Sequence, residues 1–209
     1  IRISIFAVQQ NHSLHRTMVM KFMNRENEKA TLADGRIVFL SRSTAVVVCV
    51  VCVVDGVPHV LMGERGEAVD HSGKWCMPCG YLDWDETLDE AVVREVFEET
   101  GLDLTSIAKD KVIYYDRRMP HEVISSPGEN RQNVAHIFGV VFRGPLPKLD
   151  PSAAIASKEV AQSEWVKLST IPKLEDVESP LKGMFAFKHD LRIHAFIDLL
   201  KKREVCLEL

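Results

Sequence analysis

The sequence has no apolar run long enough to cross a membrane. Its longest, residues 45–54, holds ten residues, about half of what a membrane helix needs. It also lacks a strong charge of either sign, because 26 lysines and arginines stand against 30 aspartates and glutamates, a formal charge of −4. This balance disfavours partners that bind through a basic surplus, such as nucleic acid or an anionic membrane. We therefore expect a soluble globular protein.

The number and distribution of the cysteines bear on the cellular compartment. The five cysteines are an odd number, and they are spread among segments typical of strands and loops. Such a pattern does not suggest a disulfide framework. The apolar residues 1–8 form a patch that is shorter than the core of a signal peptide. We therefore expect a protein of the reducing cytoplasm.

Segments rich in β-branched residues predict the strands of a sheet. Two such segments lie at residues 36–40 and 44–54, and further strands are expected at residues 58–63, 111–115, 134–143 and 164–168. The continuous valine run of the second segment predicts a strand buried on both faces, as in a layered α/β or α+β core. Asp55 and Gly56 supply a hairpin turn after it. Apolar residues at helical spacing predict a helix over residues 187–203.

Another helix has both of its ends defined by the sequence. Thr87 and Glu90 have the spacing of a capping box, in which each side chain accepts a hydrogen bond from the other residue's backbone N–H. Residues 88–100 contain neither glycine nor proline, and Gly101 offers a left-handed cap at the C-terminal end. The sequence therefore predicts a helix of nearly four turns over residues 88–100.

Three carboxylates share one face of this helix. A rotation of about 100° per residue places Glu95, Glu98 and Glu99 beside the apolar arc that packs on the core. Like charges at this spacing destabilise a helix, and partial burial adds to the cost. One explanation is a solvated acidic face that is balanced by Arg94. The other is a site for Mg²⁺ or Mn²⁺, which prefer oxygen ligands and accompany phosphate substrates.

The residues before the helix decide between these explanations. A pattern of fixed spacing runs over 23 residues and consists of Gly80, Glu86, Arg94, Glu95, Val96, Glu98, Glu99, Gly101 and Leu102. It resembles the Nudix box, the signature of the Nudix hydrolases, with every fixed position present. The lead-in at residues 73–80 and the segment 158–166 are also similar to that family, although Cys79 stands where the first of the family's two lead-in glycines usually falls.

The resemblance covers roughly residues 36–178 and implies a fold. That fold is an α/β/α sandwich around a mixed sheet, with helix 88–100 as its metal-bearing element. The chain would then consist of an N-terminal extension (1–35), a Nudix hydrolase domain (36–178) and a C-terminal helical segment (179–209) that packs on the domain. The extension or the C-terminal segment could also form a homodimer interface, an arrangement common in the family.

The resemblance also implies roles for individual residues. It gives as metal ligands the carboxylates of Glu95, Glu98 and Glu99 and the carbonyl of Gly80. Glu95 and Glu98 are catalytic candidates on this basis, together with Glu159, which is a candidate general base or additional ligand. Arg94 and Glu86 would orient the ligands, the usual task of residues that contact metal-bound groups.

The implied reaction is hydrolysis of the diphosphate linkage in a nucleoside diphosphate linked to another group. Mg²⁺ or Mn²⁺ would neutralise the phosphates and lower the pKa of a bound water, and a carboxylate would accept its proton. Substrate contacts are expected from Trp84 and from loop 116–133, through Arg117, Arg118 and Arg131; a solvated basic loop is the alternative. ADP-ribose or nucleotide-sugar substrates are favoured. Nucleoside triphosphates, capped or triphosphorylated RNA 5′ ends, and a non-catalytic nucleotide sensor are the alternatives.

Two pairs of cysteines offer rival interpretations. Cys49 and Cys52 could form a zinc site with Cys76 and Cys79, but positions three apart in a strand face opposite sides. The second pair resembles a thioredoxin motif. However, no helix begins at its first cysteine, where one would lower the thiol pKa. A reversible regulatory disulfide between Cys76 and Cys79 stays open.

Overall fold

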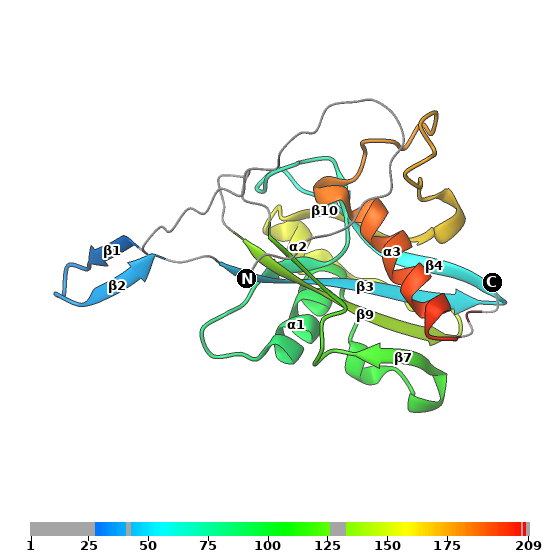
Figure 1. Cartoon of the computed structure of the whole chain (residues 1–209), viewed down its shortest axis with the longest axis horizontal. Coiled ribbons are helices and arrows are strands. Elements are labelled where there is room, and N and C mark those ends of the chain that lie inside the picture. The colour runs from blue at the N-terminus through cyan, green and yellow to red at the C-terminus, as the bar shows by residue number, and fades with distance from the viewer. Residues whose placement is uncertain (1–27, 41–42, 126–132, 206, 208–209) are drawn as a thin grey trace, which may run out of the picture. The chain divides into compact units, whose positions relative to one another are not determined.

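The computed structural model describes residues 28–40, 43–125, 133–205 and 207. The chain divides into two compact units, residues 1–41 and 42–209. In the first unit, β1 (Glu28–Thr31) pairs antiparallel with β2 (Ile37–Leu40). The second unit carries all the other elements (Figure 1). None of the helices in the described ranges is long and apolar enough to reach across a membrane.

An eight-stranded mixed sheet forms the centre of the second unit. Its strands are β3 (Thr44–Val54), β4 (Val57–Arg65), β5 (Trp75–Cys76), β6 (Cys79–Tyr81), β7 (Val112–Asp116), β8 (Glu122–Ser125), β9 (Val134–Arg143) and β10 (Val160–Lys167). The main path has the order β10-β4-β3-β9-β7, and β5, β6 and β8 pair with β4, β3 and β9. Strands β3 and β9 are parallel, and the other pairs of this sheet are antiparallel.

Helices lie on both faces of the sheet (Figure 1). The helical elements are α1 (Leu88–Thr100), α2 (Ser152–Ala156), α3 (His189–Lys202) and the 3₁₀ segments η1 (Leu104–Ser106), η2 (Lys109–Lys111), η3 (Leu168–Thr170) and η4 (Ala186–Lys188). Successive residues of β3 alternate between two apolar clusters. One cluster holds Ile193 and Phe196 of α3, and the other holds Val92 and Val96 of α1. The expected α/β/α sandwich around a mixed sheet is therefore confirmed.

Three of the predicted elements have the bounds that the sequence indicates, and all but one of the others differ by at most two residues at either end. Strands β3 and β9 and helix α1 begin and end at the predicted residues. Two predictions were wrong. Strand β10 begins at Val160, four residues before its predicted start, because its first half pairs with β4 despite its polar sequence. The predicted loop 116–133 contains β8, which pairs with β9.

Candidate active site

Helix α1 carries most of the candidate residues, and local contacts fix both of its ends. The Thr87 N–H donates to the Glu90 carboxylate at 2.8 Å, as in the predicted capping box. Gly101 ends the helix with φ of 73°, and its N–H donates to the Phe97 carbonyl at 2.7 Å. A Cβ at Gly101 would lie 2.5 Å from the Asp150 carbonyl oxygen. Both the conformation and the close approach therefore require glycine here.

Arg94 collects three carboxylates around one guanidinium. Its Nη1 donates to Glu95 Oε1 at 2.8 Å and to Glu98 Oε2 at 2.9 Å. Its Nε and Nη2 donate to the two oxygens of Glu86, and Nη2 also donates to the Tyr81 carbonyl. The hydrogen bonds from Arg94 lower the pKa of Glu86. Arg94 thus fixes the directions of Glu95 and Glu98 relative to each other.

Glu95 lies directly against the backbone of Gly80. Strand β6 pairs Gly80 with Val46 of β3, in a part of the sheet that α1 covers. A Cβ at Gly80 would lie 2.1 Å from Glu95 Oε1, so this position leaves room for the carboxylate only because it is glycine. The Glu95 residue is 7% exposed. Burial raises its pKa to about 7, although Arg94 acts in the opposite direction.

Glu99 contacts the residue that precedes Gly80 in the chain. Its Oε2 accepts a hydrogen bond from the Cys79 N–H at 3.3 Å. Desolvation raises the pKa of Glu99 well above its usual range, and Cys76 and Glu95 add to this. The backbone N–H of Cys79, which replaces a glycine of the usual lead-in, thus donates a hydrogen bond to a candidate ligand.

The donor set suits a divalent cation in its chemistry. Burial penalises the charged forms of Glu95 and Glu99, and a nearby positive ion would favour those charged forms. Carboxylate and carbonyl oxygens are also the ligands that Mg²⁺ and Mn²⁺ prefer. Within the described ranges, however, the structure brings no three acidic, histidine or cysteine side chains close enough together to hold a metal ion. Glu95 and Glu98 converge on Arg94, whereas Glu99 converges on Cys79.

Glu159 is held by its backbone and keeps its side chain exposed. Its carbonyl accepts a hydrogen bond from the Gly66 N–H at 2.9 Å. A Cβ at Gly66 would lie 2.2 Å from the Lys158 carbonyl oxygen, so glycine permits this close approach. The contact anchors the start of β10 beside the end of β4. The Glu159 carboxylate is not among those that Arg94 collects.

The residues expected to contact substrate are only partly brought together. Arg117 reaches the first turn of α1, where its Nε lies 3.9 Å from an Asp89 oxygen, and its guanidinium lies over the Tyr115 ring. Trp84, in the loop before α1, is fully exposed. Arg118 is exposed as well. Arg131 lies outside the described residues.

The sequence did not indicate two further residues near the site, His136 and Asn133. Gly80, Val46 and His136 lie in one row across β6, β3 and β9. Among the described residues, the Nδ1 atom of His136 is buried without a hydrogen-bond partner. The Tyr81 hydroxyl lies 3.3 Å from Asn133 Oδ1. Only the register of β3 with β9 brings these residues to Gly80, and no local pattern indicates that register.

The cysteines pack as the strand argument predicts. Cys49 belongs to the cluster that includes α3, and Cys52 belongs to the cluster that includes α1, so the two thiols face opposite sides of β3. Burial raises the pKa of Cys52 to about 11. Cys76 and Cys79 are free thiols in contact with each other. A regulatory disulfide between them stays a prediction.

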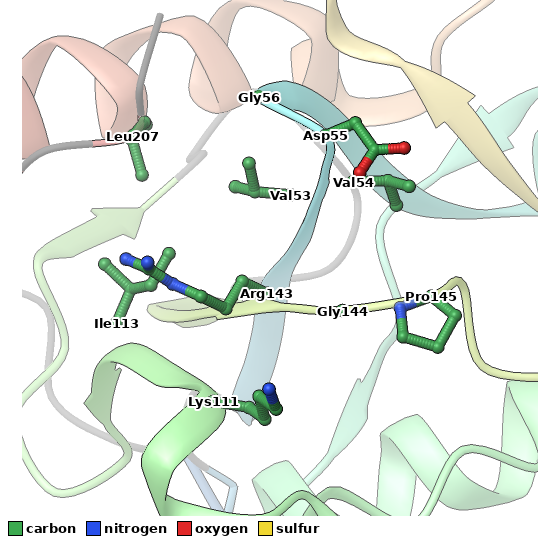
Figure 2. Close-up of a pocket in the computed structure, with 10 residues that line it drawn as sticks. All are labelled: Val53, Val54, Asp55, Gly56, Lys111, Ile113, Arg143, Gly144, Pro145 and Leu207. Carbon is green, nitrogen blue, oxygen red and sulfur yellow. The ribbon is translucent and has the colours of Figure 1, made fainter.

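A pocket of about 490 Å³ lies at the other end of β3 (Figure 2). Its lining includes Val53, Lys111 and Arg143. Lys111 Nζ lies 3.9 Å from an Asp110 oxygen. Because Gly80 pairs with Val46, near the beginning of β3, this pocket is not part of the glutamate site.

Burial of Glu95 makes the metal-free protein less stable as the pH rises. The pKa of Glu95 is near 4.5 in an unfolded chain and about 7 in the folded one, so between these values only the folded protein keeps the proton. We expect this group to lower the free energy of unfolding by on the order of 2 kcal/mol between pH 5 and pH 8. Urea unfolding in EDTA measures the free energy of unfolding of the wild type and of Glu95→Gln. The wild type should become less stable relative to Glu95→Gln as the pH rises. Parallel pH profiles for the two proteins would contradict the assignment.

The stretch that holds these residues matches a known family. Residues 43–186 match the model of the NUDIX domain. The RNA pyrophosphohydrolase of Bartonella tribocorum is 26% identical over 110 residues, which cover 51% of this chain and 64% of that protein. The ADP-ribose pyrophosphatase of Methanocaldococcus jannaschii is 31% identical over 118 residues, 56% of this chain and 60% of that protein. The chain therefore spans about three fifths of the length of these curated relatives.

Solved structures share the fold. The NUDIX domain of Shewanella oneidensis NrtR, complexed with ADP ribose, superposes with a TM-score of 0.54 at 18% identity, over 78% of this chain and 90% of that one. A Caenorhabditis elegans Ap4A hydrolase superposes with a TM-score of 0.53 at 16% identity, over 77% of this chain and 98% of that one. Because the matching family model covers more than half of the 209 residues, this chain belongs to the Nudix family.

Proposed function

We propose that the chain is a divalent-metal-dependent hydrolase that cleaves the diphosphate linkage of a nucleoside diphosphate linked to another group. The observation that carries this proposal is the buried Glu95 carboxylate, which lies against Gly80 and is oriented together with Glu98 by Arg94. A desolvated carboxylate that one arginine aligns with a second, more exposed carboxylate is suited to bind a cation and, through it, phosphate oxygens.

Each part of the site would have a separate task. The carboxylates of Glu95, Glu98 and Glu99 and the Gly80 carbonyl would hold Mg²⁺ or Mn²⁺, which supplies charge neutralisation and acidifies water. Arg94, held by Glu86, keeps the carboxylates in place. Glu159 or one of the α1 glutamates accepts the proton of the attacking water. Arg117 and Arg118, together with Arg131, would bind the phosphates, and the exposed indole of Trp84 would stack on the base.

ADP-ribose and nucleotide sugars are the substrates that we favour. The relative from Methanocaldococcus jannaschii, 31% identical over its matched part, is an ADP-ribose pyrophosphatase. Matches to RNA pyrophosphohydrolases of two Bartonella species, at 26% and 29% identity, support triphosphorylated RNA 5′ ends as the second candidate substrate.

Product analysis by mass spectrometry tests the proposal. The full chain is incubated with ADP-ribose, a nucleotide sugar, nucleoside triphosphates and a 5′-triphosphorylated oligoribonucleotide, each with Mg²⁺, with Mn²⁺ and with EDTA. We expect cleavage with either metal and none with EDTA, giving a nucleoside monophosphate and a phosphorylated second product from ADP-ribose. Pyrophosphate release from the oligoribonucleotide, without cleavage of the other compounds, would favour the RNA substrate. Binding of these compounds in calorimetry without any cleavage would overturn the hydrolase and indicate a nucleotide sensor.

A further inference from the structure

The loop that leads to Gly80 is held by hydrogen bonds from both sides of the sheet. Residues 77 and 78 connect β5 to β6, which begins at Cys79, and only Met77 and Cys79 offer backbone donors here because Pro78 has no N–H. The Cys79 N–H donates to Glu99 of α1. The Met77 N–H donates to Nδ1 of His189, the first residue of α3, at 3.0 Å. Helix α3 therefore contacts the loop directly, although it lies on the sheet face opposite α1.

His189 is suited to accept this hydrogen bond at every pH at which the protein would be assayed. The residue is 4% exposed, and Met77 is fully buried. Burial lowers the pKa of His189 to about 3, with smaller effects from Arg65 and Arg192. The ring is therefore neutral, and because its Nδ1 accepts the Met77 proton, its own proton is on Nε2.

The backbone before α3 is bent to bring His189 to this position. Phe187 and Lys188 both have left-handed conformations, with φ of 54° and 57°, which cost residues other than glycine on the order of 1 kcal/mol each. Side-chain packing holds the bend, since the Phe187 ring contacts His71, lies 5.0 Å below the Arg65 guanidinium and touches the His189 ring.

A second backbone contact brings the same segment to β5. The Trp75 N–H donates to the Met184 carbonyl at 2.9 Å, and Trp75 forms a parallel bridge with Phe185. Residues 184–189 thus run beside the chain from β5 to Met77, and the last of them, His189, accepts the hydrogen bond from Met77. His189 itself lies beyond the stretch that matches the family model, which ends at residue 186.

We propose that His189 is a positioning residue of the candidate active site. By accepting the Met77 N–H, it sets the path of residues 77–79 and so the place of the Gly80 backbone against Glu95. The same path sets the direction in which the Cys79 amide meets Glu99. This inference rests on the proposed function, because it assigns His189 to the arrangement of the donors that would hold the metal ion.

Three variants separate positioning from stability. His189→Leu removes the acceptor and leaves the buried Met77 N–H unpaired. We expect kcat to fall about tenfold to a hundredfold, the range found when contacts to metal ligands are removed, with KM little changed. His189→Asn can place its Oδ1 near the position of Nδ1 and should restore most of kcat. His194→Leu is the matched control, because His194 lies on the same helix and its Nε2 bonds the Ile171 carbonyl at 2.9 Å, away from the loop.

Amide hydrogen exchange of the metal-free protein provides a readout that does not depend on activity. In a peptide covering residues 75–81, exchange should be faster in His189→Leu, and should match the wild type in His189→Asn and His194→Leu. Titration with Mn²⁺ alone, followed by electron paramagnetic resonance, should show weaker binding only in His189→Leu. If His189→Leu does not fold, His189→Gln replaces it in these experiments. The side-chain oxygen of glutamine lies one methylene farther from the backbone than the position of Nδ1, so it cannot take over the hydrogen bond.

The outcomes distinguish this inference from the proposed function. Equal kcat, exchange and Mn²⁺ affinity in His189→Leu and His194→Leu would overturn the positioning role while leaving the hydrolase intact. A wild type that cleaves no substrate in the presence of metal would overturn the hydrolase. In that case, faster exchange and weaker Mn²⁺ binding only in His189→Leu would still show that His189 positions the loop.

Discussion

Replacing Glu98 by glutamine should lower the kcat of metal-dependent hydrolysis about a thousandfold, the rate equivalent of several kcal/mol of lost charge stabilisation. Glutamine keeps the size of the side chain but removes the charge that would bind the cation. The fold should be retained, because the Glu98 side chain is 57% exposed and its exposed ion pair with Arg94 contributes under about 1 kcal/mol. Steady-state kinetics and thermal unfolding of the full chain measure the two effects.

Glu90→Gln is the matched control for this variant. It makes the same chemical change on the same helix, and glutamine can also take the third position of a capping box, where Glu90 accepts the Thr87 N–H. Its kcat should stay close to that of the wild type. Equal kcat values for Glu98→Gln and the wild type would refute the assignment of Glu98 as a ligand.

Gly80→Ala should lower kcat about a hundredfold, the scale expected when a reacting group is displaced by about 1 Å. The new methyl group would lie 2.1 Å from Glu95 Oε1, so the carboxylate has to move away from its place beside the loop. Folding should be little affected, because the clash is with the end of a flexible side chain and Gly80 is part of strand β6.

Gly63→Ala provides the comparison for the glycine variant. Gly63 also lies in a strand of the sheet, and the nearest atom to an added Cβ there is 3.7 Å away, an ordinary contact. The two variants should therefore differ far more in kcat than in melting temperature, as steady-state kinetics and thermal unfolding measure. A Gly80→Ala protein with the activity of Gly63→Ala would show that the position of Glu95 beside Gly80 does not matter for turnover.

The success of sequence-based prediction depended on how local the determining contacts are. Helix α1 was predicted to the residue because its caps lie at its own ends, in Thr87 and Gly101. Strands β5 and β6 were missed because they have two and three residues and are strands only through pairing with β4 and β3. Pro78 lies between the two strands and Gly80 lies within β6. Proline and glycine both disfavour strand structure when only neighbouring residues are considered.

The same distinction applies to the candidate site. The shared face of Glu95, Glu98 and Glu99 follows from helical spacing within one element. By contrast, the contacts of Arg117 with Asp89 and of His189 with Met77 were missed. Each of these depends on packing between distant segments, which no periodicity or motif reveals.

The parallel pairing of β3 with β9 bears on the order in which the protein assembles. Its register joins Thr44 to Val134, residues 90 apart (134 − 44), and β4, β5, β6 and α1 all lie in the connection that the pairing closes. Closing so long a loop is slow, and its entropic cost is offset only once the later strand arrives. A chain still emerging from the ribosome therefore holds the whole signature motif before it holds the strand that completes the central pair. The carboxylates of α1 are thus present in the growing chain before the sheet that would position them can form.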